Sequence, residues 1–416
     1  MQFVVLGNGI AGITAASTIR RLKKEAKITI VTKEPYPAYS ACILPRYLSG
    51  EIDKKGVFIK DFSDYSKDNI HLILSQKAVS IDLDRRNVLF ESGSIKYDKL
   101  IVSTGSKPIL PPIKGIDKKG VFIFKSLDDA DHIFNWHGQT VAVVGSGPIG
   151  VEASIALKQR GCKVFLLELL ERILPQVFDH DSASIIKNIL ERNGINVLTH
   201  ERVTEIIGTN MVHGVITDRR TVKCDAVILA TGMQPESDLV EGVLERGQFG
   251  GIKVDDRMGT PIQDIFACGD CTEARSLIDG KPVLSLLWHN ARWQGEVAAS
   301  NAAGIPRKYI GSLNITGMDV FGIQAVSIGS IAGDRGLDAI EIKRDQAYMR
   351  LVLSNGWLIG VQSINWDENL GPFLATILRK EKINICKEVI PPESLSPKDF
   401  RYFPFGQKFR SWSHTK

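Results

Sequence analysis

Two short glycine motifs in this sequence have a spacing that suits the binding of a phosphate group. They lie in LGNGIAG and VGSGPIG, and each has the form Gly-x-Gly-x-x-Gly. In such a motif the first glycine permits a tight turn, the second lets the backbone approach a pyrophosphate, and the third lets a helix pack closely on a strand. The glycines concerned are Gly7, Gly9, Gly12, Gly145, Gly147 and Gly150. Either motif alone could be a chance turn, but the repeat predicts two dinucleotide sites.

Each motif stands between apolar runs that we expect to form strands. QFVVL precedes the first motif and KITIVT follows its predicted helix, while TVAVV and KVFLLE flank the second motif in the same way. The runs do not alternate with polar residues, which is typical of strands buried on both faces of a parallel sheet. Gly7 and Gly145 are far enough apart for each repeat to be a domain of its own. The repeat therefore predicts an α/β fold with two Rossmann-like domains.

A carboxylate near the end of the second strand of each repeat could bind the ribose of the nucleotide. Glu168 ends KVFLLE, and a carboxylate there accepts hydrogen bonds from the ribose 2′-hydroxyl and repels a 2′-phosphate. The second site is therefore predicted to prefer NADH to NADPH. In the first repeat the strand ends at Thr32, and the nearest carboxylate is that of Glu34.

The composition describes a globular chain of several domains. With 416 residues it is longer than one ordinary domain, and at ~150 residues per domain about three are expected. The formal charge of +5 comes from lysines and arginines spread along the chain, without the dense basic block typical of nucleic-acid binding. The six cysteines are scattered, so no disulfide framework is expected. No apolar stretch reaches the ~18 residues that span a bilayer, and MQFVVLGNGIAG lacks the features of a secretory signal, which predicts a cytoplasmic protein.

Three further segments complete the pattern: STGSKP (103–108), ATGMQP (230–235) and IFACGDC (265–271). With the two glycine motifs, and in order and spacing from residue 1 to about 305, they resemble the pyridine nucleotide-disulfide oxidoreductases and related flavoproteins. The resemblance implies FAD at the first motif and NAD(H) at the second. It implies that the Thr-Gly pairs carry the crossings between domains, and that the Gly-Asp pair binds the ribityl and pyrophosphate region of FAD. The residues concerned are Thr104, Gly105, Thr231, Gly232, Gly269 and Asp270.

The same resemblance implies a division into three domains. An FAD-binding domain would cover 1–110 and 244–312, with an NAD(H)-binding domain at 111–243 and a C-terminal α+β interface domain at 313–416. The last part contains the strand-like AVSIGSI, YMRLVLS and WLIGVQSI, the helical PFLATILRKEKI, and a basic end with proline and aromatic residues. Such a domain commonly makes a dimer contact in the family, and docking of a partner protein is the competing use. A homodimer or a place in a hetero-oligomer is therefore expected.

Two residues are candidates for positioning the reacting rings. By the resemblance, Glu152 helps to place the nicotinamide, and a glutamate that only favours the helix dipole is the alternative. Trp288 lies in LLWHNARWQGEVAA, which is similar to a Trp-x-Asn-Ala-x-x-Gln run that puts an aromatic residue against the flavin in rubredoxin and ferredoxin reductases. A core tryptophan is the alternative here. His289 is given no catalytic role.

Cys42 lies in YSACILPRYLSGEI, where single-cysteine members of the superfamily carry a redox-active cysteine in a run like Cys-Gly-Leu-Pro-Tyr. Ile43 stands where glycine is usual and Arg46 where tyrosine is usual. Ile10 occupies the place of the histidine of NADH oxidases and peroxidases, which argues against oxygen or peroxide chemistry. A buried, inert thiol is the alternative for Cys42, because activation requires a lowered pKa.

The sequence leaves three hypotheses for the electron acceptor. The first is transfer from NADH to a redox protein of ferredoxin or rubredoxin type, or to a partner subunit, and the segment around Cys42 also resembles NAD(H)-linked modules of nitrite reductases and multi-subunit electron-transfer complexes. The second is a thiol-disulfide reductase that uses Cys42, similar to coenzyme A disulfide reductases but without their tyrosine-rich C-terminal segment. The third is a flavin-binding subunit whose basic end docks a larger assembly. No iron–sulfur cluster or other metal site is expected, and Cys268 and Cys271 belong to the FAD segment rather than to a dithiol.

Overall fold

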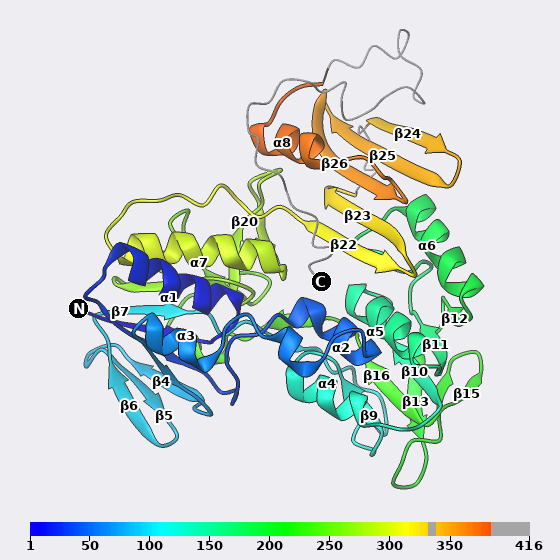
Figure 1. Ribbon diagram of the computed structural model, residues 1–416, viewed down its shortest axis with the longest axis horizontal. Coiled ribbons are helices and arrows are strands. Elements are labelled where there is room, and N and C mark those ends of the chain that lie inside the picture. Colours follow the sequence, from blue (N-terminus) through cyan, green and yellow to red (C-terminus); the bar gives the residue numbers. More distant parts are fainter. Residues whose placement is uncertain (332–337, 384–416) are drawn as a thin grey trace.

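The computed structural model describes residues 1–331 and 338–383 of the chain. Two parallel sheets carry the two glycine motifs, as the repeat predicts (Figure 1). The first has the strand order β19-β7-β1-β2-β3, and the second has the order β12-β11-β10-β16-β9. Every neighbouring pair in both sheets is parallel.

The first sheet is packed against two helices on one face. Its strands are β1 (Gln2–Leu6), β2 (Lys27–Val31), β3 (Ile70–Ile73), β7 (Lys99–Val102) and β19 (Ile265–Ala267). Helices α1 (Ile10–Leu22) and α7 (Trp288–Ala302) lie side by side over it, far apart in sequence but in contact (Figure 1). A Cβ at Gly295 would lie 2.4 Å from the carbonyl oxygen of Ala11, so this close approach requires glycine.

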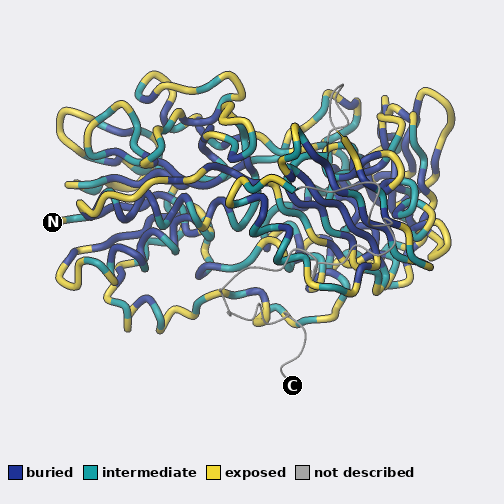
Figure 2. The backbone as a smooth tube through the Cα atoms, turned by 90° about the horizontal axis from the view of Figure 1, so that it is seen from above, coloured by how far each residue is buried: buried dark blue, intermediate teal, exposed yellow. Residues whose placement is uncertain are grey.

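The second sheet repeats this arrangement. Its strands are β9 (Val121–Ile123), β10 (Thr140–Val144), β11 (Lys163–Leu167), β12 (Ile195–Leu198) and β16 (Ala226–Leu229). The helices of this unit are α4 (Leu127–Phe134), α5 (Pro148–Gln159) and α6 (His180–Arg192). The buried residues of these elements are the dark stretches of the backbone tube in Figure 2, and exposed residues lie mainly in the loops around them.

The two Thr-Gly segments lead into a pair of short strands. Strand β8 (Ser106–Pro108) pairs antiparallel with β17 (Met233–Pro235), so the two chain crossings lie side by side. Small antiparallel sheets are formed by β4 (Ala78–Asp82), β5 (Asn87–Phe90) and β6 (Gly93–Lys96), and by β13 (Val203–Ile207), β14 (Gly214–Thr217) and β15 (Thr221–Lys223). A third small sheet contains β18 (Ile252–Lys253), β20 (Thr272–Arg275) and β21 (Pro282–Leu284).

The C-terminal part is an antiparallel sheet with one helix, in agreement with the predicted α+β class. Its strands are β22 (Ile315–Val320), β23 (Ile323–Gly329), β24 (Asp338–Arg344), β25 (Ala347–Ser354) and β26 (Trp357–Ile364). Helix α8 (Gly371–Arg379) is shorter than the sequence suggested, because Lys380 adopts a left-handed conformation with φ of 54°. The basic end of the chain lies outside the described residues.

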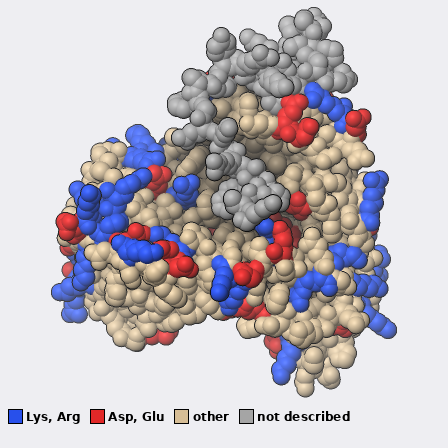
Figure 3. All heavy atoms as spheres, viewed as in Figure 1, with Lys and Arg blue, Asp and Glu red and all other residues tan. Residues whose placement is uncertain are grey.

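Charged groups of both signs are interspersed over the face of the molecule shown in Figure 3. This distribution agrees with the absence of a dense basic block from the sequence. None of the helices within 1–331 and 338–383 is long and apolar enough to cross a membrane.

Candidate active site between the two dinucleotide folds

A cavity of about 1810 Å³ lies at the carboxyl ends of the strands of both parallel sheets. Ligands of open α/β sheets bind in this position. The fold brings together here nearly all residues that the sequence singled out. They are Gly7, Gly9, Glu34, Cys42, Thr104, Gly105, Gly145, Gly147, Glu152, Glu168, Thr231, Gly232, Gly269, Asp270 and Trp288.

The glycines of the two motifs divide into those that face the cavity and those that do not. A Cβ at Gly9 or Gly147 would meet no atom within 4 Å, so the backbone there is open to a ligand. A Cβ at Gly12 would lie 2.0 Å from the carbonyl oxygen of Gly7. A Cβ at Gly150 would lie 2.0 Å from the carbonyl oxygen of Gly145. Gly12 and Gly150 therefore allow helix and strand to pack closely, and both motifs fit a pyrophosphate.

Glu168 follows β11 directly and is held in one orientation. Its Oε2 accepts hydrogen bonds from the backbone N–H of Ser146 at 2.9 Å and from the Ser146 hydroxyl at 2.6 Å. Its Oε1 accepts a hydrogen bond of 2.8 Å from the N–H of Leu170. The carboxylate is only 7% exposed, yet it lines the cavity. Sequence reasoning missed Ser146, although it lies inside the second motif.

Glu34 also lines the cavity, three residues after the end of β2 at Val31 and two after Thr32. Its backbone N–H donates to the Thr32 hydroxyl at 3.3 Å. Burial, followed by the negative charge of Glu34, raises the pKa of Tyr39, so the carboxylate lies close to this phenol. The first motif thus has a carboxylate within its cavity wall, and its contact with a ribose stays a prediction.

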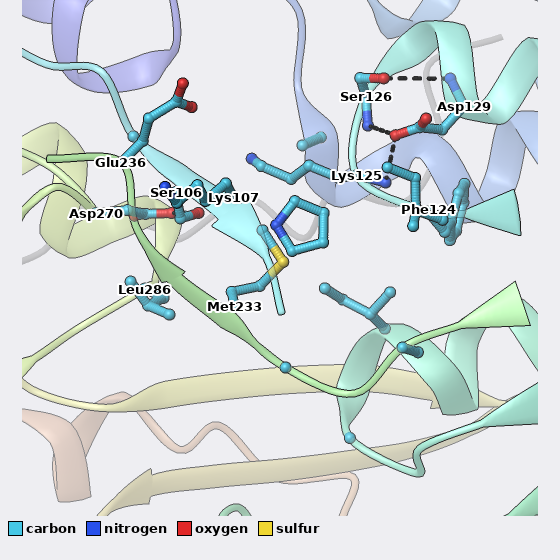
Figure 4. A pocket seen from close by; sticks show the side chains of 18 of the residues that line it. Ser106, Lys107, Phe124, Lys125, Ser126, Asp129, Met233, Glu236, Asp270 and Leu286 are labelled. Atoms are coloured by element: carbon cyan, nitrogen blue, oxygen red, sulfur yellow. Dashed lines mark hydrogen bonds between the residues drawn. The ribbon is translucent and has the colours of Figure 1, made fainter. Parts of the chain in front are cut away.

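Asp270 is paired with two residues that sequence reasoning did not identify. Its Oδ2 accepts a hydrogen bond of 2.9 Å from the Ser106 hydroxyl. Burial raises the pKa of Asp270, while the charge of Lys125 and the Ser106 hydrogen bond oppose this shift. Figure 4 shows the Lys125 side chain extending into the cavity towards Ser106 and Asp270. The capping box of Ser126 and Asp129 marks the start of α4 in the sequence, but nothing local indicates that Lys125 reaches Asp270.

Cys42 lies in a short 3-10 turn (Ala41–Ile43) before α2 (Leu44–Ser49). Its side chain is exposed to the cavity, below the outer surface of the protein. Burial, and then the negative charges of Glu152 and Asp270, raise the pKa of the thiol to about 11, although Lys125 opposes this. Burial also raises the pKa of Glu152 to about 7. Cys42 therefore faces the cavity in surroundings that disfavour the thiolate, and its redox role stays a prediction.

A family model described as pyridine nucleotide-disulphide oxidoreductase matches residues 1–295. The chain belongs to this family. It is 34% identical to an NADH oxidase of Methanocaldococcus jannaschii, over 82% of this chain and 79% of that protein. It is 30% identical to the assimilatory nitrate reductase electron transfer subunit of Bacillus subtilis, over 95% of this chain but only 52% of the subunit, so it spans about half of that relative's length. Among solved structures, a NAD-dependent persulfide reductase from A. fulgidus superimposes with a TM-score of 0.84 at 30% identity, over 91% of this chain and 77% of that one.

Membership of this family makes the chain an NAD(H)-dependent oxidoreductase with FAD as cofactor. The two glycine motifs, with open backbone at Gly9 and Gly147 beside one shared cavity, fit both nucleotides. Bound FAD supplies the two-electron exchange with NAD(H). The chain itself would bind and orient the two nucleotides in this cavity.

Trp288 is the first residue of α7 and lines the cavity, rather than lying wholly inside a core. His289 also lines the cavity. Burial lowers its pKa, and its Nε2 hydrogen-bonds the Leu313 carbonyl oxygen at 2.7 Å. Cys268 and Cys271 are completely buried free thiols that do not line the cavity. No group of three or more metal-ligating side chains occurs among the described residues.

Proposed function

We propose that this chain exchanges electrons between NAD(H) and a redox protein or partner subunit of ferredoxin or rubredoxin type. The observation that carries the proposal is the state of Cys42, which is the single cysteine along the described cavity wall. Burial, and then the negative charges of Glu152 and Asp270, raise its pKa to about 11, whereas thiol-disulfide chemistry requires the thiolate. Electrons would therefore leave the site without a thiol intermediate.

The residue assignments of this proposal rest on the two glycine motifs and on the cavity that both motifs line. Gly7, Gly9 and Asp270 would hold FAD, and Gly145 and Gly147 would hold the pyrophosphate of NAD(H). Glu168 would bind the adenosine ribose, because Ser146 and Leu170 orient its carboxylate. A negative charge at this position disfavours the 2′-phosphate of NADPH.

Three further residues would control the space where the rings meet. Trp288 would cover the ring system with an apolar face. Glu152, with a pKa of about 7, would be partly neutral at physiological pH and so leave little excess negative charge there. The ammonium of Lys125 would balance negative charge that collects in the cavity.

One relative supports a protein acceptor. The Bacillus subtilis protein that matches 95% of this chain is named an electron transfer subunit. Such a name fits a flavoprotein that passes electrons to another redox centre. Because the chain covers only about half of that protein, the partner of this chain belongs to the proposal.

The test measures the rate of reduction of a one-electron acceptor and asks whether that rate depends on the Cys42 thiol. Under anaerobic conditions, NADH and the FAD-loaded protein should reduce a bacterial ferredoxin, and Cys42→Ser should keep the rate within about twofold. Cys162→Ser is the matched control, since this thiol does not line the cavity. Failure to reduce any ferredoxin, rubredoxin or one-electron dye, or loss of the rate in Cys42→Ser alone, would exclude the proposal.

A thiol-based reductase is the second candidate, because Cys42 faces the cavity and a persulfide reductase shares the fold at 30% identity. In that case anaerobic titration with NADH would produce a thiolate-flavin charge-transfer band. Cys42→Ser would abolish both the band and the turnover of a coenzyme A disulfide or persulfide, while reduction of the flavin by NADH would persist.

A further inference from the structure

A buried group of polar side chains joins α6 to the C-terminal sheet. Helix α6 packs against β22 and β26 and lies beside that sheet in Figure 1. Asp179 is the N-cap of α6, where its Oδ1 accepts a hydrogen bond of 2.8 Å from Ser182 N–H. Its own N–H donates to Gln362 Oε1 at 2.8 Å, and its Oδ2 lies 2.8 Å from Arg350 Nη1. We call Asp179, Arg350 and Gln362 the Asp179 clamp.

The Asp179 clamp buries charged and polar groups whose hydrogen bonds are only partly satisfied. Asp179 is 9% exposed and Gln362 is fully buried, and Arg350 Nη1 is shared with Glu341 Oε1 at 3.0 Å. Asp179 Oδ2 pairs with Arg350 as an ion pair but has no hydrogen-bond partner, and Arg350 Nε, Gln362 Nε2 and Ser182 Oγ are likewise buried without one. Buried ion pairs often stabilise a fold no better than apolar side chains, but they can select one geometry. The clamp is therefore suited to holding the start of α6 in a defined place.

The segment that enters the clamp forms one wall of the NAD(H) side of the cavity. Residues 169–178 connect Glu168 to Asp179, and the cavity is lined by Leu169, Leu170, Leu174, Pro175, Gln176 and Val177. Leu174 has φ of 50°, a left-handed conformation that a bulky residue keeps only where its surroundings impose it. Its N–H donates to the carbonyl oxygen of Ser146 at 3.0 Å. The glycine motif thus fixes the middle of the segment, and the clamp fixes its end.

We propose that Arg350 and Gln362 are positioning residues for NAD(H). By holding Asp179, they keep residues 169–178 in the conformation that completes the nucleotide site. Arg350 and Gln362 do not line the cavity, so they act through this segment and not by contact with the nucleotide. The inference concerns only the NAD(H) side and is independent of the electron acceptor.

The test separates binding from turnover in the full-length, FAD-loaded protein. Arg350→Gln should raise the Kd for NAD+, measured by isothermal titration calorimetry, and the KM for NADH, measured with ferricyanide, by about tenfold. The kcat should stay within about twofold, because no group at the reaction centre changes. Arg350→Lys should restore part of the affinity, since it returns the positive charge.

Arg344→Gln is the matched control. Arg344 ends β24 of the same sheet and forms an ion pair with Glu368 at 3.2 Å, but it is not part of the clamp. If Arg350→Gln does not fold, the Kd for NAD+ is measured in Asp179→Asn instead. Asparagine keeps an N-cap acceptor but loses the charge. The same rise in Kd is expected for it. An unchanged Kd in the folded clamp variant, or an equal rise in Arg344→Gln, overturns the proposal.

Discussion

The carboxylate of Glu168 has both oxygens engaged by Ser146 and Leu170, so its negative charge is fixed at the cavity wall. Glu168→Gln removes this charge and keeps a similar shape. We expect the ratio of kcat/KM for NADPH to that for NADH to rise about tenfold or more, because repulsion of the 2′-phosphate is lost. Steady-state rates with both nucleotides measure this ratio.

The control is Glu171→Gln, which changes the same charge at an exposed residue that does not line the cavity. It should leave the preference for NADH in place. An equal change in both variants would show that the overall charge of the segment, and not the ribose contact, sets the preference.

The thiol of Cys42 gives a prediction of pH dependence. With a pKa of about 11, its thiolate fraction at pH 8 is about one in a thousand, and alkylation by iodoacetamide should accelerate about tenfold per pH unit from 7 to 10. Glu152 is ionised above its pKa of about 7, and its charge raises the thiol pKa. Glu152→Gln should therefore lower the thiol pKa and speed alkylation at pH 8 to 9.

Mass spectrometry of the peptide that contains Cys42 gives the rate. Glu51→Gln, an exposed carboxylate paired with Arg46 at 2.7 Å and absent from the cavity wall, is the control. Rapid alkylation at pH 7 with no further rise would contradict the prediction and favour the thiol-based candidate.

The sequence predicted individual cavity-lining residues where a local motif fixes their position. The glycines and Glu168 belong to one strand-turn-helix-strand unit, so their spacing alone placed them. Lys125 and Ser106 could not be assigned in this way, because their contact with Asp270 depends on how segments distant in sequence pack together. The exposure of Cys42 to the cavity likewise depends on packing between elements.

Among the elements, the turn that joins β10 to α5 offers a pair of substitutions with opposite expectations. Gly150→Ala would place a Cβ 2.0 Å from the Gly145 carbonyl oxygen, so α5 would have to shift. We expect the melting temperature to fall by several degrees, in line with the ~1–3 kcal/mol cost of overpacking a tight site. Thermal unfolding followed by circular dichroism measures this.

Gly147→Ala is the counterpart, since its Cβ would meet no atom of the protein. The melting temperature without nucleotide should stay within about one degree of wild type, while the Kd for NAD+ should rise because the methyl group occupies the space next to the pyrophosphate. Similar melting temperatures for the two alanine variants would contradict the division of roles between the glycines.

The parallel strands were predictable because their apolar runs are continuous, but the C-terminal elements were only partly so. Strands β22 and β24 were not foreseen, although the apolar residues of DAIEIKR alternate with charged ones, a pattern typical of a half-exposed strand. The end of α8 was predicted too late. Lys380 turns left-handed and the N–H of Ile383 bonds to the Gly356 carbonyl oxygen at 2.8 Å, a tertiary contact that overrides the helical pattern of RKEKI.

At the scale of the whole molecule, the Asp179 clamp joins residues that are distant in sequence and carry no motif. Nothing local marks Arg350 or Gln362, since each looks like an ordinary polar residue of a strand. Their role follows only from the contact of α6 with the C-terminal sheet. The sequence therefore predicted the C-terminal part as an interface for partners, but not its contact with the segment beside the NAD(H) site.

This contact has a thermodynamic consequence for the molecule as a whole. If the clamp favours NAD(H) binding, then bound nucleotide must strengthen the clamp by the same free energy. We expect NAD+ to slow amide hydrogen exchange in β25, β26 and the start of α6, although none of the clamp residues lines the cavity. The effect should disappear in Arg350→Gln at a nucleotide concentration that still saturates the site. Strands β5 and β6 are the internal control, because they lie in a separate small sheet and do not line the cavity. They should exchange equally with and without nucleotide. Protection confined to the cavity-lining segments would mean that the C-terminal sheet is not coupled to the nucleotide site.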